Sequence, residues 1–381
     1  MLEFLVAMKI LYYSSYFLPY TSGITTTTYN ILDHLGKKHS ISLLTFRHDP
    51  KLKKEERMGK ITVFRMLFNL RVSKGFISFS SLFYFLRSVK TADVVVVNLP
   101  NVEAFLLVLL AKLSGKKVIV LFHCDIQLEG GIGARLVTAI TRFATFLQLV
   151  LADTVVAYPD YLFGDWYEHV FKNKLKMCLP VFQKPTVNVA YKRDLQKKKQ
   201  HRVWIGFVGR IAREKGLEYL IQASELLKKK GLNFELVFVG PKDVVGETSY
   251  RDKIMKMLKR DSIPHLFLGM LLRSELGAFY QTVDVVVVPS INRTEGISIA
   301  QLEAMTEGTP VVVSSLPGVR YPVQKTGMGL TVSPRNIQAL ADGLLTVTQN
   351  KNRFSNKENI QKANSLFSSR KVLKCYDDLF R

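Results

Sequence analysis

Runs of apolar residues recur along the chain, and segments with helical periodicity separate them. In the first half most runs are continuously apolar rather than alternating, which is typical of strands buried on both faces of a parallel sheet. We expect strands at 9–15, 40–46, 61–67, 92–98, 116–123 and 153–159, and helices at 25–35, 103–113 and 134–150. This alternation predicts an open α/β sheet of parallel strands.

The pattern restarts after a polar, basic segment at 191–202. Expected strands follow at 202–209, 234–240, 265–270, 283–290 and 310–314, with helices at 216–230, 250–260 and 274–281. From about Gln361 the pattern is helical and no new strand is expected. We therefore predict two Rossmann-like domains, 1–190 and 203–360, with a basic linker at 191–202 and a C-terminal helix at 361–381.

Composition fits this organisation and adds a constraint on partners. The chain has 381 residues, of which 48% are hydrophobic and 22% charged, enough for two domains with full cores. Its formal net charge is +23, and such an excess usually implies an anionic partner: nucleic acid, an anionic membrane or a phosphorylated ligand. The three cysteines show no CxxC spacing, so we expect no disulfide framework and a reducing, cytoplasmic compartment.

The sequence predicts neither a signal peptide nor a membrane-spanning helix. The first seven residues lack a basic region and are too short for a signal peptide, and both Met1 and Met8 are candidate starts. The apolar stretch 136–152 is interrupted by Arg142 and Gln148, whereas a spanning helix needs about 20 mostly apolar residues. We expect this stretch to be a core helix.

Two glutamates, Glu295 and Glu303, lie between the apolar runs 283–288 and 310–314. The segment between these runs predicts a loop followed by a helix. In open parallel sheets ligands bind outside the carboxyl ends of the strands, where a helix start also offers free backbone N–H groups. By spacing alone the pair also fits the acid and base of a glycosidase, but its place in the second of two Rossmann-like domains disfavours that reading.

Arg210 and Lys215 follow the expected strand 202–209. At that position an arginine and a lysine can converge on phosphate oxygens, the arginine through two parallel hydrogen bonds. The segment VGRIAREKGLEYLIQA (208–223) and the glutamate pair, with EAMTEGTPVV from Glu303, together resemble the retaining glycosyltransferases of family 4. The resemblance implies the GT-B architecture: two Rossmann-like domains whose parallel sheets face each other across a cleft, with the C-terminal helix packing back on the first domain.

The resemblance also implies roles in the second domain. Arg210 and Lys215 would bind the diphosphate of a nucleotide-sugar donor and stabilise its charge as the glycosidic bond breaks. Glu295 would contact hydroxyls of the donor sugar, and Glu303 those of the ribose. The donor would also approach the helix start through Gly296, Ile297, Ser298, Ile299 and Ala300. Ser298 is in addition a candidate N-cap, which is compatible with ligand contact.

In the first domain the resemblance implies fewer contacts. Gly23 would lie against the diphosphate, where the family usually has two glycines. This chain has Ser22 in place of the first one, so a hydroxyl is available there for the acceptor. His123, at the end of the expected strand 116–123, would contact the donor sugar as a catalytic residue. Asp125 is a weaker candidate for acceptor contact.

Two motifs are absent from the sequence. There is no Asp-x-Asp to hold a divalent metal on a nucleotide-sugar, and no GxGxxG followed by an acid for a nicotinamide ribose. We therefore expect no metal and no cofactor. The substrate would be a nucleotide-sugar such as a UDP- or GDP-hexose.

Residues 57–92 contain no acid and interleave basic with aromatic side chains. This mixture suits an anionic membrane surface, although a core helix with solvated basic flanks or an RNA-binding segment would also explain it. We expect a hexosyltransferase that acts on a lipid-linked or membrane-associated glycan in cell-envelope synthesis, at the inner face of the membrane. A soluble sugar acceptor and a non-enzymatic nucleic-acid-binding protein are the alternatives. The oligomeric state is open.

Overall fold

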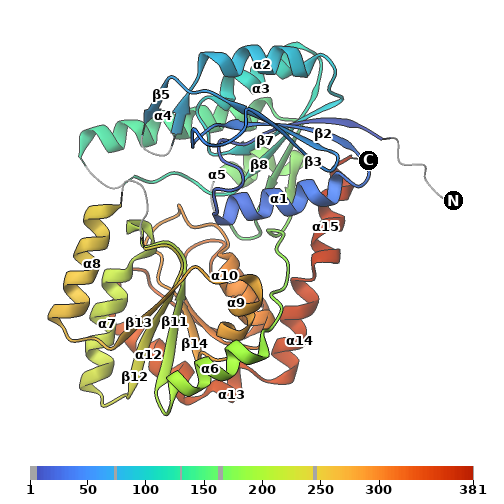
Figure 1. Ribbon diagram of the computed structural model, residues 1–381. Helices are drawn as coiled ribbons and strands as arrows, with labels where there is room; N and C mark the ends of the chain where they lie inside the picture. The colour runs from blue at the N-terminus through green and yellow to red at the C-terminus, as the bar shows by residue number, and fades with distance from the viewer. Residues whose placement is uncertain (1–6, 73–74, 129–130, 162–165, 243–246, 381) are drawn as a thin grey trace. The chain divides into compact units, whose positions relative to one another are not determined.

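The structure is a computed structural model that describes residues 7–72, 75–128, 131–161, 166–242 and 247–380. Met1, one of the two candidate starts, lies outside these ranges. The chain forms two compact units (Figure 1): unit 1 comprises Met1–Phe182 and Arg370–Arg381, and unit 2 comprises Gln183–Ser369.

Unit 1 is built on one sheet in the order β10-β9-β8-β7-β1-β2-β4-β3, in which β3 is antiparallel to β4 and the other neighbours are parallel. The central strands are those expected from the apolar runs. The short or polar strands β3, β10 and the hairpin β5–β6 were not expected. The strands are β1 (Lys9–Tyr13), β2 (Ser40–Phe46), β3 (Glu55–Met58), β4 (Ile61–Met66), β5 (Leu70–Val72), β6 (Gly75–Ile77), β7 (Val94–Leu99), β8 (Lys117–Phe122), β9 (Thr154–Ala157) and β10 (Leu175–Met177).

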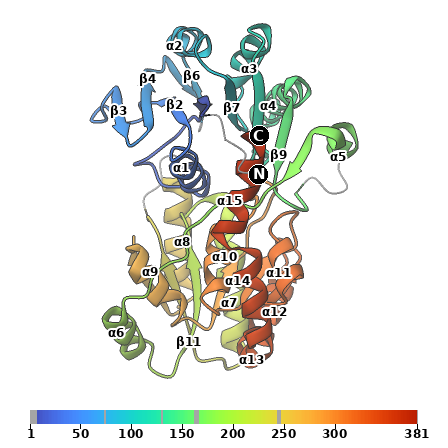
Figure 2. The same ribbon diagram turned by 90° about the vertical axis from the view of Figure 1, so that its right-hand side faces the viewer.

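The helices of unit 1 cover both faces of its sheet. Helices α2, α3 and α4 lie side by side on one face, and α1 lies on the other (Figures 1 and 2). The helices are α1 (Gly23–Leu35), α2 (Phe79–Val89), α3 (Ala104–Leu113), α4 (Ile132–Leu151), α5 (Trp166–Phe171) and α15 (Ser369–Asp377), with short 3₁₀ turns at Lys172–Lys174 and Asp378–Phe380.

Unit 2 contains a fully parallel sheet in the order β13-β12-β11-β14-β15-β16. Its strands are β11 (Val203–Val208), β12 (Phe234–Val239), β13 (His265–Gly269), β14 (Val285–Val288), β15 (Val311–Ser314) and β16 (Gly329–Val332). Strand β16 was not expected, because only four residues with a single long apolar side chain form it. The chain runs outward from β11 to β13 and then returns to β14, so the strand order reverses between β11 and β14.

Helices α7, α8 and α12 pack against this sheet in one apolar core cluster. Helices α9 and α14 both pack on α10. The helices of unit 2 are α6 (Val189–Lys199), α7 (Leu217–Lys229), α8 (Thr248–Arg260), α9 (Arg273–Tyr280), α10 (Ile299–Thr306), α11 (Tyr321–Thr326), α12 (Ile337–Gln349), α13 (Lys351–Phe354) and α14 (Lys357–Leu366), with a 3₁₀ turn at Arg213–Lys215.

The basic segment 191–202 differs from the linker that the sequence suggested. Most of it is helix α6, capped by the side chain of Asn188 and held on unit 2 through the buried Leu195. Lys199 pairs with Asp284 at 2.6 Å. Polar composition alone did not distinguish a surface helix from a linker, because a helix with a single buried position shows little apolar periodicity.

Helix α4 is not the core helix that we expected. Its buried face carries small and polar side chains, among them Thr141, Thr145 and Gln148. Its exposed face is mainly apolar, with Ile132, Leu136, Ile140, Phe143 and Val150, and it also carries Arg135 and Arg142. Ile132 is 85% exposed and Phe143 64% exposed. By length and composition α4 could cross a membrane, and only 28% of its most apolar 18-residue segment is buried.

Residues 57–92 divide between core and surface. Arg65 is buried and pairs with Glu56 at 2.7 Å, and Phe76 and Phe85 are also buried. Phe83 on α2 points into solvent and is 64% exposed. Lys74 and the side chain of Arg71 lie outside the described part of the chain. The stretch is therefore partly core, as one of the alternatives held, and its exposed apolar side chains concentrate on α2.

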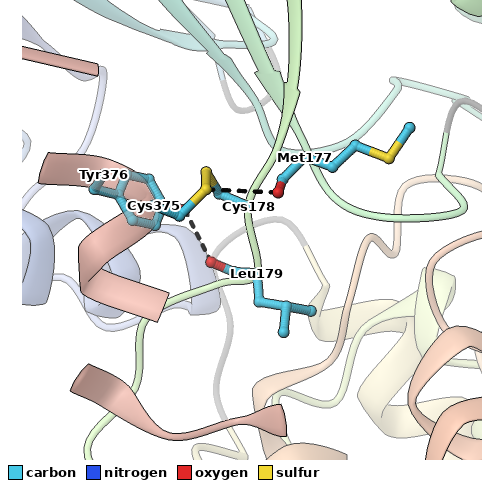
Figure 3. The surroundings of a disulfide bond; sticks show 5 residues. All are labelled: Met177, Cys178, Leu179, Cys375 and Tyr376. Atoms are coloured by element: carbon cyan, nitrogen blue, oxygen red, sulfur yellow. Dashed lines mark hydrogen bonds between the residues drawn. A yellow bond between two sulfur atoms is a disulfide. The ribbon is translucent and has the colours of Figure 1, made fainter. Parts of the chain in front are cut away.

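A disulfide joins Cys178 to Cys375, contrary to the expectation of none (Figure 3). The two cysteines are 197 residues apart, so local spacing gave no signal for the pair. They meet because α15 returns to unit 1, where the Tyr376 hydroxyl donates to the Leu179 carbonyl at 3.0 Å. Asp377 pairs with Lys38 of unit 1 at 2.8 Å. The predicted return of the C-terminal helix to the first domain is thus confirmed.

Candidate functional site

The reversal of strand order between β11 and β14 places two loops next to each other at the carboxyl edge of the unit 2 sheet. Strands β11 and β14 are direct neighbours, with Ile205 opposite Val285. The loop after β11 carries Arg210 and Lys215, and the loop after β14 carries Glu295. In open α/β sheets this is the position at which ligands bind.

Gly216 allows these two loops to pack together. It is left-handed, with φ +65°, and ends the 3₁₀ turn that carries Lys215. A Cβ atom at Gly216 would lie 2.3 Å from the Pro289 carbonyl oxygen and 2.6 Å from Ile291 Cγ2, so only glycine fits. The Ile291 N–H donates to the Glu214 carbonyl at 3.1 Å and fixes the contact. In the Lys-Gly pair of the sequence motif, Lys215 therefore supplies a charge and Gly216 allows the two loops to pack together.

The loop contact brings opposite charges together. The ammonium of Lys215 forms an ion pair with Glu295 Oε2, and the Ser290 hydroxyl donates to the same oxygen at 3.0 Å. Arg210 lies earlier in the same loop and pairs with Glu214 at 3.2 Å. Two cations and a carboxylate thus gather at one edge of the sheet, as a site for an anionic and hydroxylated ligand requires.

Helix α10 begins four residues after Glu295, at Ile299. Its N-cap residue, Ser298, makes no side-chain capping hydrogen bond. The N-cap position that we considered for Ser298 is therefore confirmed, but its hydroxyl does not cap the first turn of α10. The predicted contacts from Gly296 to Ala300 surround this helix start, where the helix dipole favours an anion.

Glu303 lies in the second turn of α10 and is 4% exposed. Its Oε2 accepts a hydrogen bond from the Tyr280 hydroxyl at 2.9 Å, and its Oε1 lies 3.4 Å from Arg273 Nη1. Burial raises the pKa of Glu303 to about 7, against the lowering effects of the Arg273 charge and the Tyr280 hydrogen bond. A carboxylate held in this way is a strong acceptor for hydroxyl donors.

His123 belongs to a buried hydrogen-bond network in unit 1. The Asn98 amide nitrogen donates to Ser14 and Thr28, so Asn98 Oδ1 must accept, and His123 Nε2 donates to it at 3.0 Å. His123 Nδ1 then accepts from the Tyr158 hydroxyl at 2.8 Å. Burial lowers the pKa of His123 to about 4, so the ring is neutral at physiological pH. Its contact with a donor sugar stays a prediction.

The remaining candidates of unit 1 also have structural partners. Ser22 caps α1: its hydroxyl accepts from the Thr25 N–H at 3.2 Å, and its own N–H donates to the Thr25 hydroxyl at 2.8 Å. Gly23 is the first residue of that helix. Asp125 pairs with Arg142 of α4 at 2.6 Å. The serine that replaces the usual glycine therefore has a capping role, and its contact with an acceptor stays a prediction, as does that of Asp125.

Three partners in these clusters were missed by the sequence reasoning. Tyr280 and Arg273 lie 23 and 30 residues before Glu303, and no motif links them to it. Asn98 gave a signal that could have been used, because it is the polar residue that ends the apolar run of β7. Across the described residues no three His, Cys, Asp or Glu side chains come together as a metal site. Metal independence stays a prediction.

Comparison with known proteins identifies the second unit. Residues 190–365 match the family "Glycosyl transferases group 1". Unit 2 is a group 1 glycosyltransferase domain. The resemblance inferred from the two motifs is confirmed. An uncharacterized glycosyltransferase of Methanocaldococcus jannaschii is 36% identical over 36% of this chain and 34% of its own length. A D-inositol 3-phosphate glycosyltransferase of Corynebacterium urealyticum is 36% identical over 37% and 33%. The chain thus matches about a third of the length of these relatives.

Solved structures extend the similarity to both units of this glycosyltransferase-like chain. Sucrose-phosphate synthase of Thermosynechococcus elongatus has a TM-score of 0.77 and 17% identity, with 98% of each chain covered. HepE of Anabaena, solved in complex with UDP-glucose, has a TM-score of 0.77 and 16% identity, covering 98% of this chain and 99% of its own. These similarities establish the GT-B fold, and identities this low establish the fold alone.

Proposed function

We propose that the protein is a retaining glycosyltransferase that uses a nucleotide diphosphate sugar, such as a UDP-hexose. One observation carries this proposal: Arg210, Lys215 and Glu295 gather at the strand-order reversal of a group 1 glycosyltransferase domain, beside the start of α10. A diphosphate needs the two cations and the helix start, and a sugar needs the carboxylate. HepE, a structural neighbour, was solved with UDP and with UDP-glucose, which supports a UDP-linked donor.

Each side chain of unit 2 has a role in this proposal. Arg210 and Lys215 bind the diphosphate, whose charge grows as the bond to the sugar breaks. Glu295 accepts hydrogen bonds from sugar hydroxyls, and Glu303 accepts them from the ribose. Lys215 and Glu295 form an ion pair, so each holds the other side chain in position for the donor.

The reaction exchanges one bond at the anomeric carbon for another. The bond from this carbon to the diphosphate oxygen breaks, and the acceptor oxygen attacks from the same face, so the configuration is retained. The acceptor proton passes to the departing diphosphate. His123 does not take this proton, because burial lowers its pKa to about 4 and both ring nitrogens already have hydrogen-bond partners. Positioning and charge stabilisation then provide the rate enhancement.

The test is a transfer and binding assay with UDP- and GDP-hexoses. Lys215→Ala should lower turnover by about a hundredfold or more, since lost charge stabilisation costs about 2–4 kcal/mol, and Glu303→Ala should lower activity by weakening donor binding, because it removes the acceptor for the ribose hydroxyls. Lys253→Ala, on α8, removes an exposed cation elsewhere in unit 2 and should leave turnover unchanged. Full activity of both site variants would refute the assignment, and absence of binding to every nucleotide-sugar would refute the function.

For the acceptor we propose a lipid-linked or membrane-associated glycan. The apolar face of α4, formed by Ile132, Leu136, Ile140, Phe143 and Val150, supports this choice because monomeric soluble proteins seldom expose so continuous an apolar stripe. Helix α4 has 20 residues and is therefore about 30 Å long. Neighbouring helices α2 and α3 add exposed Phe83 and Leu106.

Charge on these helices favours an anionic bilayer as the surface that receives α4. Arg135 on α4, and Arg87 and Lys90 at the end of α2, are exposed. An amphipathic surface helix with basic neighbours binds at the boundary between head groups and acyl chains, and each basic residue near an anionic surface contributes about 1 kcal/mol. The protein would then work at the inner face of the cell membrane. Its exposed aromatic and basic residues within 57–92 contribute to the same surface.

Vesicle sedimentation tests this part of the proposal. The protein should bind vesicles containing phosphatidylglycerol, and the double variant Ile140→Glu/Phe143→Glu should lose binding while keeping its transfer activity on a short soluble acceptor. Val189→Glu, an equally exposed apolar position on α6 of unit 2, is the matched control. If wild-type protein ignores vesicles and glycosylates a free sugar or polyol phosphate, the acceptor is soluble, as the name of the D-inositol 3-phosphate relative suggests for that protein.

A further inference from the structure

The two carboxylate oxygens of Glu303 have different partners. Oε2 accepts from Tyr280, and Oε1 faces Arg273. Both partners come from α9: Tyr280 is its last residue and Arg273 its first. The first and last residues of one helix therefore contact the same carboxylate, Tyr280 from the buried side and Arg273 from the exposed side.

Tyr280 is a rigid partner. Its side chain is fully buried, and its backbone carbonyl accepts a hydrogen bond from the Thr309 hydroxyl at the start of the turn to β15. Burial raises the pKa of Tyr280 well above its ordinary value, so its hydroxyl keeps its proton and remains a donor. Because the Tyr280 ring is buried and its backbone is hydrogen-bonded, its hydroxyl holds Glu303 Oε2 in one position.

Arg273 is a more exposed and more distant partner. Its side chain is 42% exposed, and its 3.4 Å contact with Oε1 is long for a charge-assisted hydrogen bond. Strands β14 and β15 pack on α10 and carry no charged residue, while Glu307 on α10 opposes ionisation of Glu303. The other charged residues of the helices packed on α10 are Glu275, Lys357, Glu358 and Lys362.

We propose that Tyr280 and Arg273 are positioning residues for ribose recognition, Tyr280 by fixing Glu303 Oε2 and Arg273 by compensating the charge of Oε1 while leaving that oxygen to the ribose hydroxyls. This inference rests on the proposed role of Glu303. An oxygen already held by Tyr280 cannot turn toward a ligand, whereas the loosely paired Oε1 can exchange a long contact for short hydroxyl donors.

The test compares two ligands that differ only in the hydroxyls concerned. Whichever of UDP and GDP the wild-type protein binds is titrated beside its 2′,3′-dideoxy counterpart. Tyr280→Phe should weaken binding of the ribonucleotide by up to about tenfold, the scale of one hydrogen bond, and leave binding of the dideoxy ligand unchanged. Tyr219→Phe, on α7 and lining the groove between α7 and α8, is the matched control and should change neither. Equal losses for both ligands, or none, would overturn the role of Tyr280.

Arg273 is tested by charge and by pH. In Arg273→Met the carboxyl of Glu303 loses its compensating charge and should be mostly protonated at pH 7, so ribonucleotide binding weakens at pH 7 and recovers toward pH 9. Arg273→Lys should restore binding at pH 7. A loss that is the same at both pH values would show that Arg273 contacts the ligand itself or only supports the fold. Unchanged affinity for the dideoxy ligand verifies folding of each variant.

Glu303→Ala separates this inference from the proposed function. It should abolish the preference for the ribonucleotide over the dideoxy ligand. If that preference survives in Glu303→Ala, the proposed role of Glu303 is wrong. If Glu303→Ala abolishes the preference but Tyr280→Phe and Arg273→Met retain it, the role of Glu303 stands and the inference about its two partners fails.

Discussion

Gly216→Ala perturbs the junction that assembles the candidate site. The new Cβ would lie 2.3 Å from the Pro289 oxygen, whereas ordinary contact begins near 3.4 Å, so the loops after β11 and β14 must separate by about 1 Å. Alanine at φ +65° costs about 1 kcal/mol by itself, and overpacking adds about 2 kcal/mol. We expect a total loss of about 3 kcal/mol of stability. Displacing Lys215 by about 1 Å should also lower turnover by about a hundredfold.

Gly231→Ala is the matched control for this experiment. Gly231 is also left-handed, with φ +77°, but a Cβ atom there meets nothing within 4 Å. Urea denaturation should show a loss of about 1 kcal/mol for Gly231→Ala and about 3 kcal/mol for Gly216→Ala, and transfer assays should show full activity only for the control. Similar stability and activity of the two variants would refute the reasoning that Gly216 is required by the contact between the loops.

Three further predictions follow from other parts of the structure. Burial raises the pKa of Glu303 to about 7, so as the pH rises the unfolded chain releases this proton before the folded one, and the free energy of unfolding should fall by about 3 kcal/mol between pH 4.5 and 7. A difference in unfolding free energy between wild type and Glu303→Gln that stays constant over this range, measured by denaturation, would contradict this prediction. Reduction of the Cys178–Cys375 disulfide should destabilise unit 1 by about 3–5 kcal/mol, seen as a drop in Tm with reductant that Cys178→Ser/Cys375→Ser does not show. His123→Phe should cost about 2 kcal/mol because it removes the buried hydrogen bonds that the ring makes with Asn98 Oδ1 and with the Tyr158 hydroxyl, whereas a melting curve equal to wild type would show that these two bonds are dispensable.

Local signals predicted those parts of the fold that depend on neighbouring residues. Continuous apolar runs such as 283–288 indicated buried parallel strands, and the segments after them indicated loops at one edge of a sheet. The resemblance assigned Arg210, Lys215 and Glu295 to one donor, and the structure brings Lys215 and Glu295 into contact. The sequence did not show why Lys215 is followed by glycine, because the clash involves Pro289, more than 70 residues away.

The features that were missed depend on tertiary contacts. Tyr280 reaches Glu303 only because α9 packs on α10, and Cys178 reaches Cys375 only because α15 returns to unit 1. The stretch around α4 was misinterpreted because its apolar side chains outnumber its polar ones, which favours burial. In the structure Gln148 faces inward and donates to the Asn101 carbonyl at 2.9 Å, whereas large apolar side chains such as Ile132 and Phe143 face outward. Periodicity defines an amphipathic helix but not which of its faces meets the sheet.

The central claim is that unit 2 binds a nucleotide-sugar at the edge where β11 and β14 meet. The most direct measurement is a crystal structure of the protein with the nucleoside diphosphate that it binds in solution. We predict the diphosphate against Arg210, Lys215 and the start of α10, with the ribose hydroxyls on Glu303 Oε1. A nucleotide bound elsewhere, for example in the groove lined by Gln222 and Lys256 between α7 and α8, would contradict the claim.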